Sequence, residues 1–426
     1  MIYSILKFLI RCTAELFYSK HKIIHFENLD TSKPLIICAN HAAAHLDGML
    51  IMIFSKRRFH VLVRADVFNK PWIAKFLSYV NLIPIYRMRD GYKNLDKNSD
   101  TFDKSIDILH KNGAVIIFPE ANCVMERKLR PLHKGAAKLA FMAEERAGFT
   151  LGLQVCAIGI SQERLCDSGG RLFLEANKTR DLADYFDAYK EHPNKAYLQL
   201  MADVETDLRA VLPVIERRND EELFENLIVH LNLRDDYDKW KSLAKSINDN
   251  DDELKDVLLI AIKDFQSHLK KRFLDIRSVL KFSKYHRLKR WSNILLYLID
   301  VLALFPFFLL GFVFNVAPYA LPKWISHSIF RKDKEYANGT HIALAALLFA
   351  LSYLFFGISL YIVMGNIISV MVSLLIIAIC GVVAYHYIRR IKDFIKALSY
   401  EFSSTATKKE WKAQSDVLLS EFKHWI

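Results

Sequence analysis

Apolar and charged residues are divided unevenly along this chain of 426 residues. Up to about residue 290, short apolar runs alternate with charged stretches, as they do in globular proteins. From Ile294 to Ile388 the residues are mostly apolar, and the few charges there cluster between Lys323 and Glu335. The pattern therefore predicts a globular part followed by a part that lies in a lipid bilayer.

Two kinds of segment alternate within residues 21–180. Short apolar runs of the kind that forms buried strands occur at 34–39, 60–63, 82–86, 114–118, 154–160 and 171–175. Segments with the apolar spacing of helices occur at 42–54, 72–80, 105–111 and 135–145. Strands that alternate with helices predict an α/β domain, with a mostly parallel sheet flanked by helices.

The segments on either side of this domain have helical patterns. Residues 1–20 carry an apolar stripe on one helical face, which predicts an amphipathic helix lying in the membrane interface. Residues 181–290 interleave charged residues with leucines at helical spacing, and they predict a charged helical region. Residues 391–426 are expected to form an amphipathic tail in the cytosol.

The predicted all-α membrane region, residues 291–390, contains three apolar segments. The segments 341–364 and 367–387 are each long enough to cross about 30 Å of hydrocarbon, and their basic outer flanks place those ends in the cytosol. Segment 294–321 has basic residues on both flanks and Pro306 near its middle, so we expect a re-entrant hairpin. A single tilted span with a kink at the proline is the alternative.

The formal net charge of +12 is typical of a nucleic-acid binder, or of a protein that lies on an anionic membrane or takes phosphorylated substrates. The long apolar segments favour the second class, so we expect a lipid bilayer as partner and no nucleic acid. Six cysteines are scattered without the paired spacing of zinc sites or disulfide frameworks. This favours reduced thiols and no metal site.

The first group of residues suited to catalysis is His41, His45 and Asp47, at a predicted strand-to-helix junction. Acyl transfer from a thioester to an alcohol needs a base for the hydroxyl proton, and a histidine oriented by a carboxylate suits that role. On one regular helix His41 and Asp47 would point about 240° apart. The pair therefore works only if His41 precedes the helix and turns back. A metal pair of His41 with His45 is the alternative, although no third ligand is evident.

Two further groups of polar residues follow other predicted strands. One strand ends in Arg87, with Arg89 close behind, and arginine can bind phosphate oxygens with its planar fork. A second, buried strand leads into Glu120, at the edge where α/β proteins form ligand sites. Arg130 and Lys134 add positive charge shortly afterwards.

The three groups together resemble the motifs of the glycerolipid acyltransferase superfamily, which includes glycerol-3-phosphate and lysophosphatidate acyltransferases. Asn-His-Ala-Ala-Ala-His-Leu-Asp at 40–47 is similar to its NHxxxxD block, and Ile-Pro-Ile-Tyr-Arg at 83–87 to its arginine-ended strand. Phe-Pro-Glu-Ala at 118–121 is similar to its FPEG block, which a basic tail with glycine follows. The resemblance covers the predicted α/β domain.

The resemblance implies roles for individual residues. His41 would be the base, Asp47 would orient it, and Arg87 would bind the phosphate of the acceptor. Glu120 would help to hold the acceptor, and Lys134 would belong to the same site.

Two departures from the family pattern stand out. The spacing from histidine to aspartate is one residue longer than the commonest form, and it is similar to a branch with fungal glycerol-3-phosphate/dihydroxyacetone-phosphate acyltransferases and bacterial relatives that carry C-terminal membrane segments. Ala121 stands where the family has glycine. If that position needs a positive φ, alanine is strained there. Phosphate binding would then depend more on Arg87, Arg89 and Arg130.

We therefore expect an O-acyltransferase of phospholipid synthesis. It would move a fatty acyl group from acyl-CoA or acyl carrier protein to a glycerol-3-phosphate-type acceptor, without a metal or organic cofactor. Acylation of lysophosphatidate or another lysolipid, hydrolysis of an acyl ester, and a non-catalytic membrane scaffold that retains the fold are the alternatives. The protein is expected in a bacterial inner membrane, with its catalytic domain facing the cytosol.

Overall fold

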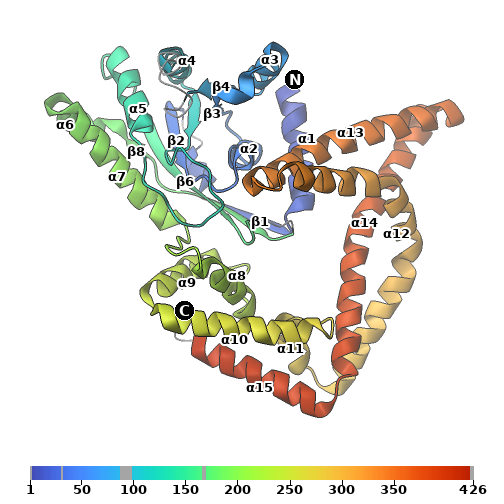
Figure 1. The fold of residues 1–426 in the computed structure, drawn as a ribbon. Coiled ribbons are helices and arrows are strands. Elements are labelled where there is room, and N and C mark those ends of the chain that lie inside the picture. Colours follow the sequence, from blue (N-terminus) through green and yellow to red (C-terminus); the bar gives the residue numbers. More distant parts are fainter. Residues whose placement is uncertain (1, 30–31, 87–97, 166–168, 423–426) are drawn as a thin grey trace. The chain divides into compact units, whose positions relative to one another are not determined.

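The computed structural model describes residues 2–29, 32–86, 98–165 and 169–422 (Figure 1). The chain divides into two compact units. The first unit contains Met1–Arg218 together with Ser326–Ala343. The second unit contains Asn219–Ile325 and Leu344–Ile426. The first unit thus includes a segment that lies far along the chain, between two apolar helices.

The described residues of the first unit form a sheet of eight strands. The strands are β1 (Lys20–Ile24), β2 (Leu35–Ala39), β3 (His60–Arg64), β4 (Leu82–Ile85), β5 (Ala114–Ile117), β6 (Gln154–Gln162), β7 (Arg171–Ala176) and β8 (Arg180–Asp181). Their order is β1-β7-β6-β2-β5-β3-β4, with β8 beside β6. Only the pairs of β6 with β7 and with β8 are antiparallel. The predicted α/β fold with a mostly parallel sheet is confirmed.

Helices cover both faces of this sheet (Figure 1). On one face lie α4 (Asn98–His110), α5 (Gly135–Arg146) and α7 (Pro193–Val211), and on the other lie α1 (Ile2–Phe17) and α2 (His45–Phe54). The other α-helices described within residues 2–218 are α3 (Pro71–Tyr79) and α6 (Phe186–Glu191).

The central strand β2 shows why its sequence is apolar throughout. Ile36 and Cys38 point into the core under α4, α5 and α7, whereas Leu35, Ile37 and Ala39 point into the core under α1 and α2. All five residues are fully buried. Because side chains alternate between the faces of a sheet, a strand with a core on both sides needs apolar residues at every position.

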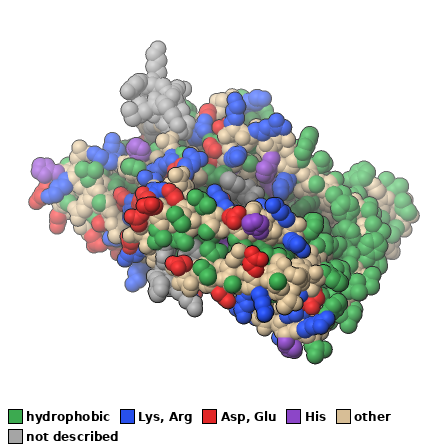
Figure 2. Space-filling model, turned by 60° about the horizontal axis from the view of Figure 1, so that its bottom comes forward, with side chains coloured by type: hydrophobic (Ala, Val, Ile, Leu, Met, Phe, Trp, Pro, Cys, Tyr) green, Lys and Arg blue, Asp and Glu red, His purple; other side chains and the backbone are tan. Residues whose placement is uncertain are grey.

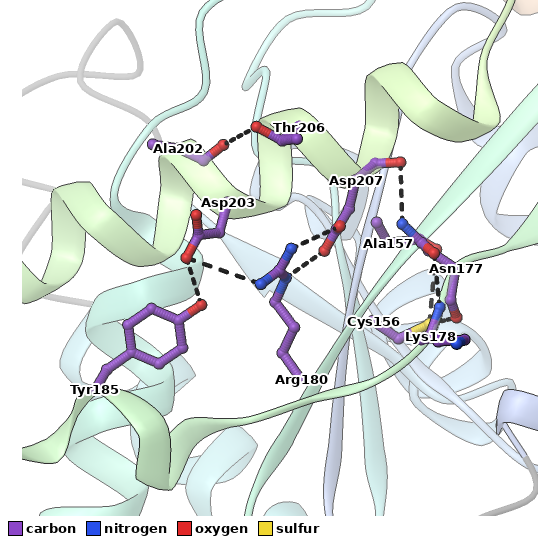
Figure 3. Close-up of polar contacts among 10 residues, drawn as sticks. All are labelled: Cys156, Ala157, Asn177, Lys178, Arg180, Tyr185, Ala202, Asp203, Thr206 and Asp207. Atoms are coloured by element: carbon purple, nitrogen blue, oxygen red, sulfur yellow. Dashed lines mark hydrogen bonds and ion pairs between the residues drawn. The ribbon is translucent and has the colours of Figure 1, made fainter.

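A polar cluster holds α7 against the sheet (Figure 3). Arg180 donates to both carboxylate oxygens of Asp207 on α7, with Nη2 2.8 Å from Oδ1. One turn earlier, Asp203 Oδ2 accepts from the hydroxyl of Tyr185 at 2.6 Å. The Nδ2 atom of Asn177 donates to the backbone oxygen of Asp207 at 3.4 Å. These paired charges fix the helix, and they lie apart from the residues that the sequence singled out.

The second unit is helical, and no strand occurs among its described residues. Its helices are α8 (Asp220–His230), α9 (Tyr237–Asp249), α10 (Asp252–Lys270), α11 (Ile276–Ser283), the long helices α12 (Arg287–Ile329), α13 (Ala337–Met364) and α14 (Ile367–Glu401), and α15 (Thr405–Phe422). Helices α9, α10 and α11 begin after aspartates whose side chains accept from backbone N–H groups, namely Asp236, Asp251 and Asp275. The charged region is therefore helical, as predicted.

Three helices, α12, α13 and α14, are long and apolar enough to cross a membrane. They carry many exposed large apolar side chains, and Figure 2 shows a dense group of hydrophobic side chains on the surface. The expected break at Pro306 is wrong, because the proline lies inside the continuous helix α12. A proline costs a helix one hydrogen bond, whereas an irregular turn would leave several backbone groups unpaired in apolar surroundings. Likewise, α14 continues past residue 387 to Glu401.

Candidate active site

The candidate site lies where two neighbouring parallel strands end. Strand β2 pairs with β5, and Cys38 stands opposite Ile117 at the ends of the two strands. The chain leaves these ends through the segments that contain His41 and Glu120. The carboxyl edge of a parallel sheet thus brings the first and third motifs together, as the sequence suggested.

The loop after β2 turns His41 back toward the start of α2. Asn40 fastens this loop to β6, because its Nδ2 atom donates to the oxygen of Ile160 at 3.0 Å and its Oδ1 atom accepts from the nitrogen of Ile160 at 2.8 Å. Ala44 then adopts φ 48°, and α2 begins at His45. His41 therefore precedes the helix, as a working pair with Asp47 requires.

His41 and Asp47 form a close pair. The Nδ1 atom of His41 lies 3.0 Å from Oδ2 of Asp47, and the backbone N–H of Ala43 donates to the same oxygen at 2.8 Å. The side chain of Asp47 is 1% exposed and that of His41 is 19% exposed. The imidazole also stacks on Phe118, with ring centroids 4.2 Å apart. With Nδ1 donating to the carboxylate, Nε2 is the basic atom of the neutral ring.

Glu120 joins the loop after β2 to the basic loop that follows β5. Its Oε1 atom accepts from the backbone N–H of His41 at 2.8 Å, and Oε2 accepts from the backbone N–H of Arg130 at 3.2 Å. Burial raises the pKa of Glu120, and the two backbone donors act in the opposite direction. Both oxygens are thus used to hold the site together.

Ala121 adopts φ 56°, in the left-handed region that favours glycine. The position therefore does require a positive φ, and alanine is strained there by about 1 kcal/mol. Its N–H donates to the oxygen of Phe118 at 3.1 Å, so the strained turn fixes the direction in which the chain leaves β5.

The positively charged residues of the sequence motifs are placed in different surroundings. The guanidinium of Arg130 donates to Glu126 at 3.0 Å, and the ammonium of Lys134 donates to the side chain of Asn194 at 3.1 Å. Both side chains are therefore paired with other residues of the first unit. Arg87 and Arg89 lie outside the described residues.

Sequence reasoning missed two groups of residues near the motif that contains His41, His45 and Asp47. The Sγ atom of Cys123 accepts from the backbone N–H of Ala44 at 2.9 Å, and burial raises the pKa of this thiol, with Asp47 nearby as a second cause. The link after α12 and the start of α13 belong to the first unit and bring Tyr336 and Gly339 beside His45. Because this segment lies far from His45 along the chain, the sequence gave no signal of the contact. Within the described ranges, no three His, Cys, Asp or Glu side chains are grouped as metal ligands would be.

The chain was compared with known protein families and structures. The family model for acyltransferases matches residues 21–161. No curated protein matches the sequence. Among solved structures, the chain is similar to the 1-acyl-sn-glycerophosphate (LPA) acyltransferase PlsC from Thermotoga maritima, with 17% identity and a TM-score of 0.36, covering 49% of this chain and 78% of that one. The chain thus contains an acyltransferase domain, and that domain holds the paired histidine and aspartate.

Proposed function

We propose that this acyltransferase moves a fatty acyl group from the thioester of acyl-CoA or acyl carrier protein to a hydroxyl of glycerol 3-phosphate. The observation that carries the proposal is the pair of His41 and Asp47 at the carboxyl edge of the sheet, where Nδ1 of His41 lies 3.0 Å from Oδ2 of Asp47. Nε2 of His41 takes the proton of the acceptor hydroxyl as its oxygen attacks the thioester carbonyl. The tetrahedral intermediate then collapses, the carbon–sulfur bond breaks, and the thiolate leaves with the proton returned by the imidazolium.

Asp47 keeps the proton of the neutral ring on Nδ1 and stabilises the imidazolium that forms during the attack. The neighbouring thiol supports direct transfer to the acceptor. Because burial raises the pKa of Cys123, this residue stays a thiol at neutral pH, and it is a poor candidate for an acyl-enzyme nucleophile.

The acceptor phosphate would be bound by the basic residues that follow β4 and β5. Arg87 and Arg89 are the first candidates, because the family resemblance assigns the phosphate to the arginine-ended strand. Arg130 and Lys134 would contribute positive charge and would exchange their present partners, Glu126 and Asn194, for phosphate oxygens. Glu120 would act mainly by holding the backbone of this basic loop.

The surroundings of the domain support a lipid product. The long apolar helices indicate membrane association. Helix α3 has no buried residue although it carries Trp72, Phe76 and Tyr79, which are 69%, 47% and 59% exposed. Tryptophan and tyrosine are typical of membrane interfaces. We infer that the domain works at the cytosolic surface of a bacterial inner membrane, where it receives a soluble thioester and releases a lipid.

An acceptor screen tests the proposal. The purified full chain in detergent is given radiolabelled acyl-CoA with glycerol 3-phosphate, dihydroxyacetone phosphate, lysophosphatidate or no acceptor. Label in lysophosphatidate formed from glycerol 3-phosphate, and its loss in His41→Ala, is the expected result. Transfer only to lysophosphatidate would mean that lysophosphatidate, and not glycerol 3-phosphate, is the acceptor. Release of free fatty acid when no acceptor is added would indicate a hydrolase. Failure to label any product would indicate a scaffold.

A further inference from the structure

The segment 333–342, which contains the link after α12 and the start of α13, belongs to the first unit. Four of its side chains are almost fully buried, at 5%, 2%, 7% and 1% exposed, namely Ala337, Asn338, His341 and Ile342. Asparagine and histidine are rarely buried to this extent in a simple connection. The segment is therefore a specific part of the fold, although it joins two apolar helices.

Three contacts anchor the segment. The Nδ2 atom of Asn338 donates to the backbone oxygen of Leu165 at 2.8 Å. The ring of His341 packs edge-on against Phe17, with centroids 5.3 Å apart. Ile342 belongs to the apolar core that lies under α1 and α2. The anchors fix the position of the residues between Glu335 and Gly339.

At this position the segment meets His45. A Cβ atom at Gly339 would lie only 2.5 Å from Nε2 of His45, so the imidazole rests directly on the glycine. The ring of Tyr336 stacks over the same imidazole at 6.2 Å, and its hydroxyl accepts from Nη1 of Arg64 at 2.6 Å. His45 keeps access to solvent, yet the protein around it lowers the pKa of its ring, against the effect of a hydrogen bond with the backbone of Gly339.

The position of His45 bears directly on the catalytic pair. His45 is the first residue of α2, and Asp47 lies in the first turn of the same helix. The N–H of Asp47 donates to the oxygen of Ala44 at 3.3 Å, and Ala44 has the strained φ of 48°. A displacement of His45 that reaches the backbone of this first turn would move the carboxylate of Asp47 relative to His41.

We propose that segment 333–342 is a positioning element of the active site, which acts through Gly339 and His45 to hold Asp47 against His41. The inference rests on the proposed function of that pair, and it adds a dependence of the reaction on the chain between the apolar helices. Glycine at 339 leaves room for the imidazole, Tyr336 covers the ring, and Asn338 and Ile342 fix both in place.

A double-mutant cycle on the full chain in detergent tests the inference. Gly339→Ala should lower kcat by roughly 10- to 100-fold, with a smaller change in the KM for acyl-CoA, because small displacements of catalytic groups are costly. The same substitution in a His45→Ala background should cost less than about twofold, because the shorter side chain leaves room for the new Cβ. Alanine is a better helix former than glycine, so intrinsic helix propensity predicts no loss.

Gly357→Ala is the matched control, because a Cβ at this glycine of α13 would make only ordinary contact, 3.5 Å from Leu374 Cδ1. It should leave kcat unchanged. If Gly339→Ala does not fold, Tyr336→Ala replaces it in a second double-mutant cycle with His45→Ala, because Tyr336 is only half-buried. Equal losses in both backgrounds, or no loss in either, would overturn the positioning role. If His41→Ala retains full activity, the proposed function itself fails, and the two failures are thereby distinguished.

Discussion

Replacing Asp47 by asparagine separates the two tasks of this residue, which are to orient His41 and to stabilise its charge. In the structure one oxygen, Oδ2, accepts from both Nδ1 of His41 and the backbone N–H of Ala43. If the amide nitrogen of the asparagine took the position of Oδ2, two hydrogen-bond donors would face each other, because the N–H of Ala43 points at that position. The carbonyl oxygen of the asparagine should therefore stay at the Oδ2 position, and Nδ1 of His41 should remain the protonated nitrogen.

The expected cost of Asp47→Asn follows from the charge alone. A hydrogen bond to a charged group contributes about 1.5–3 kcal/mol, and one between neutral groups about 0.5–1.5 kcal/mol. The imidazolium that forms in the transition state should thus lose roughly 1–2 kcal/mol of stabilisation, which lowers kcat about 5- to 30-fold. Asp47→Ala removes the acceptor as well as the charge, so its activity should be lower again.

Initial rates with labelled acyl-CoA and glycerol 3-phosphate, measured over a range of both substrates, give kcat and KM for the two variants. Thermal unfolding of each variant checks that the buried site is still folded. A kcat of Asp47→Asn as low as that of Asp47→Ala would refute the reasoning, because it would mean that the amide turns round and that the ring changes its tautomer.

Three further substitutions test other parts of the site. His41→Ala should lower kcat at least about 100-fold, or about 3 kcal/mol, with the fold intact. His45→Ala removes a positioning contact but no reacting group, so its loss should be clearly smaller, and the opposite order of activities would contradict the assignment of the base. Glu120→Gln should lower the free energy of unfolding by about 1–3 kcal/mol, because one of the backbone N–H groups now bonded to its carboxylate would face an amide donor, and an unchanged melting temperature would argue against this clamp. Arg87→Ala should chiefly raise the KM for a phosphorylated acceptor, with only partial rescue by lysine, and an unchanged KM would remove Arg87 from the site.

Most strands and the close approach of His41 to Asp47 could be predicted because their signals are local. The two-sided core makes β2 and β5 short apolar runs, and the motif that contains His41 and Asp47 spans only eight residues. Strand β1 was missed because it lies at the edge of the sheet and its sequence, Lys-His-Lys-Ile-Ile, is half polar. Edge strands often carry lysine, which discourages pairing with other chains.

The remaining features depend on contacts between distant parts of the sequence. Nothing near Gly339 indicates that His45 lies against it, because such a contact arises only when the sheet has formed and the segment has docked. Similarly, the rule that proline ends a helix comes from globular proteins in water. It fails at Pro306, where an apolar helix has no better place for its backbone groups.

The docked segment also constrains the path of α12 through the membrane. Among the described residues before Arg287, no helix is long and apolar enough to cross a bilayer. The residues after α12 belong to the same unit as that domain. A single crossing by α12 would place Lys289 and Lys334 on opposite sides of the membrane, whereas a path along one face would place them on the same side. The three prolines of α12, at 306, 318 and 322, lie inside a continuous helix, where proline can kink the axis.

Cysteine labelling in sealed vesicles tests this path. In a chain with all six native cysteines replaced by serine, single cysteines at Lys289, Lys334 and Lys392 should react only from the cytosolic side, and one at Asn366 only from outside. Lys392, near the end of α14, is expected on the same side as Lys289 because the ion pair between Arg290 and Glu401 brings the end of α14 beside the start of α12. Labelling of Lys289 and Lys334 from opposite faces would show that α12 crosses once. The segment that carries Gly339 could then not rest on His45, and the positioning role would fail with the topology, whereas the catalytic pair would be untouched.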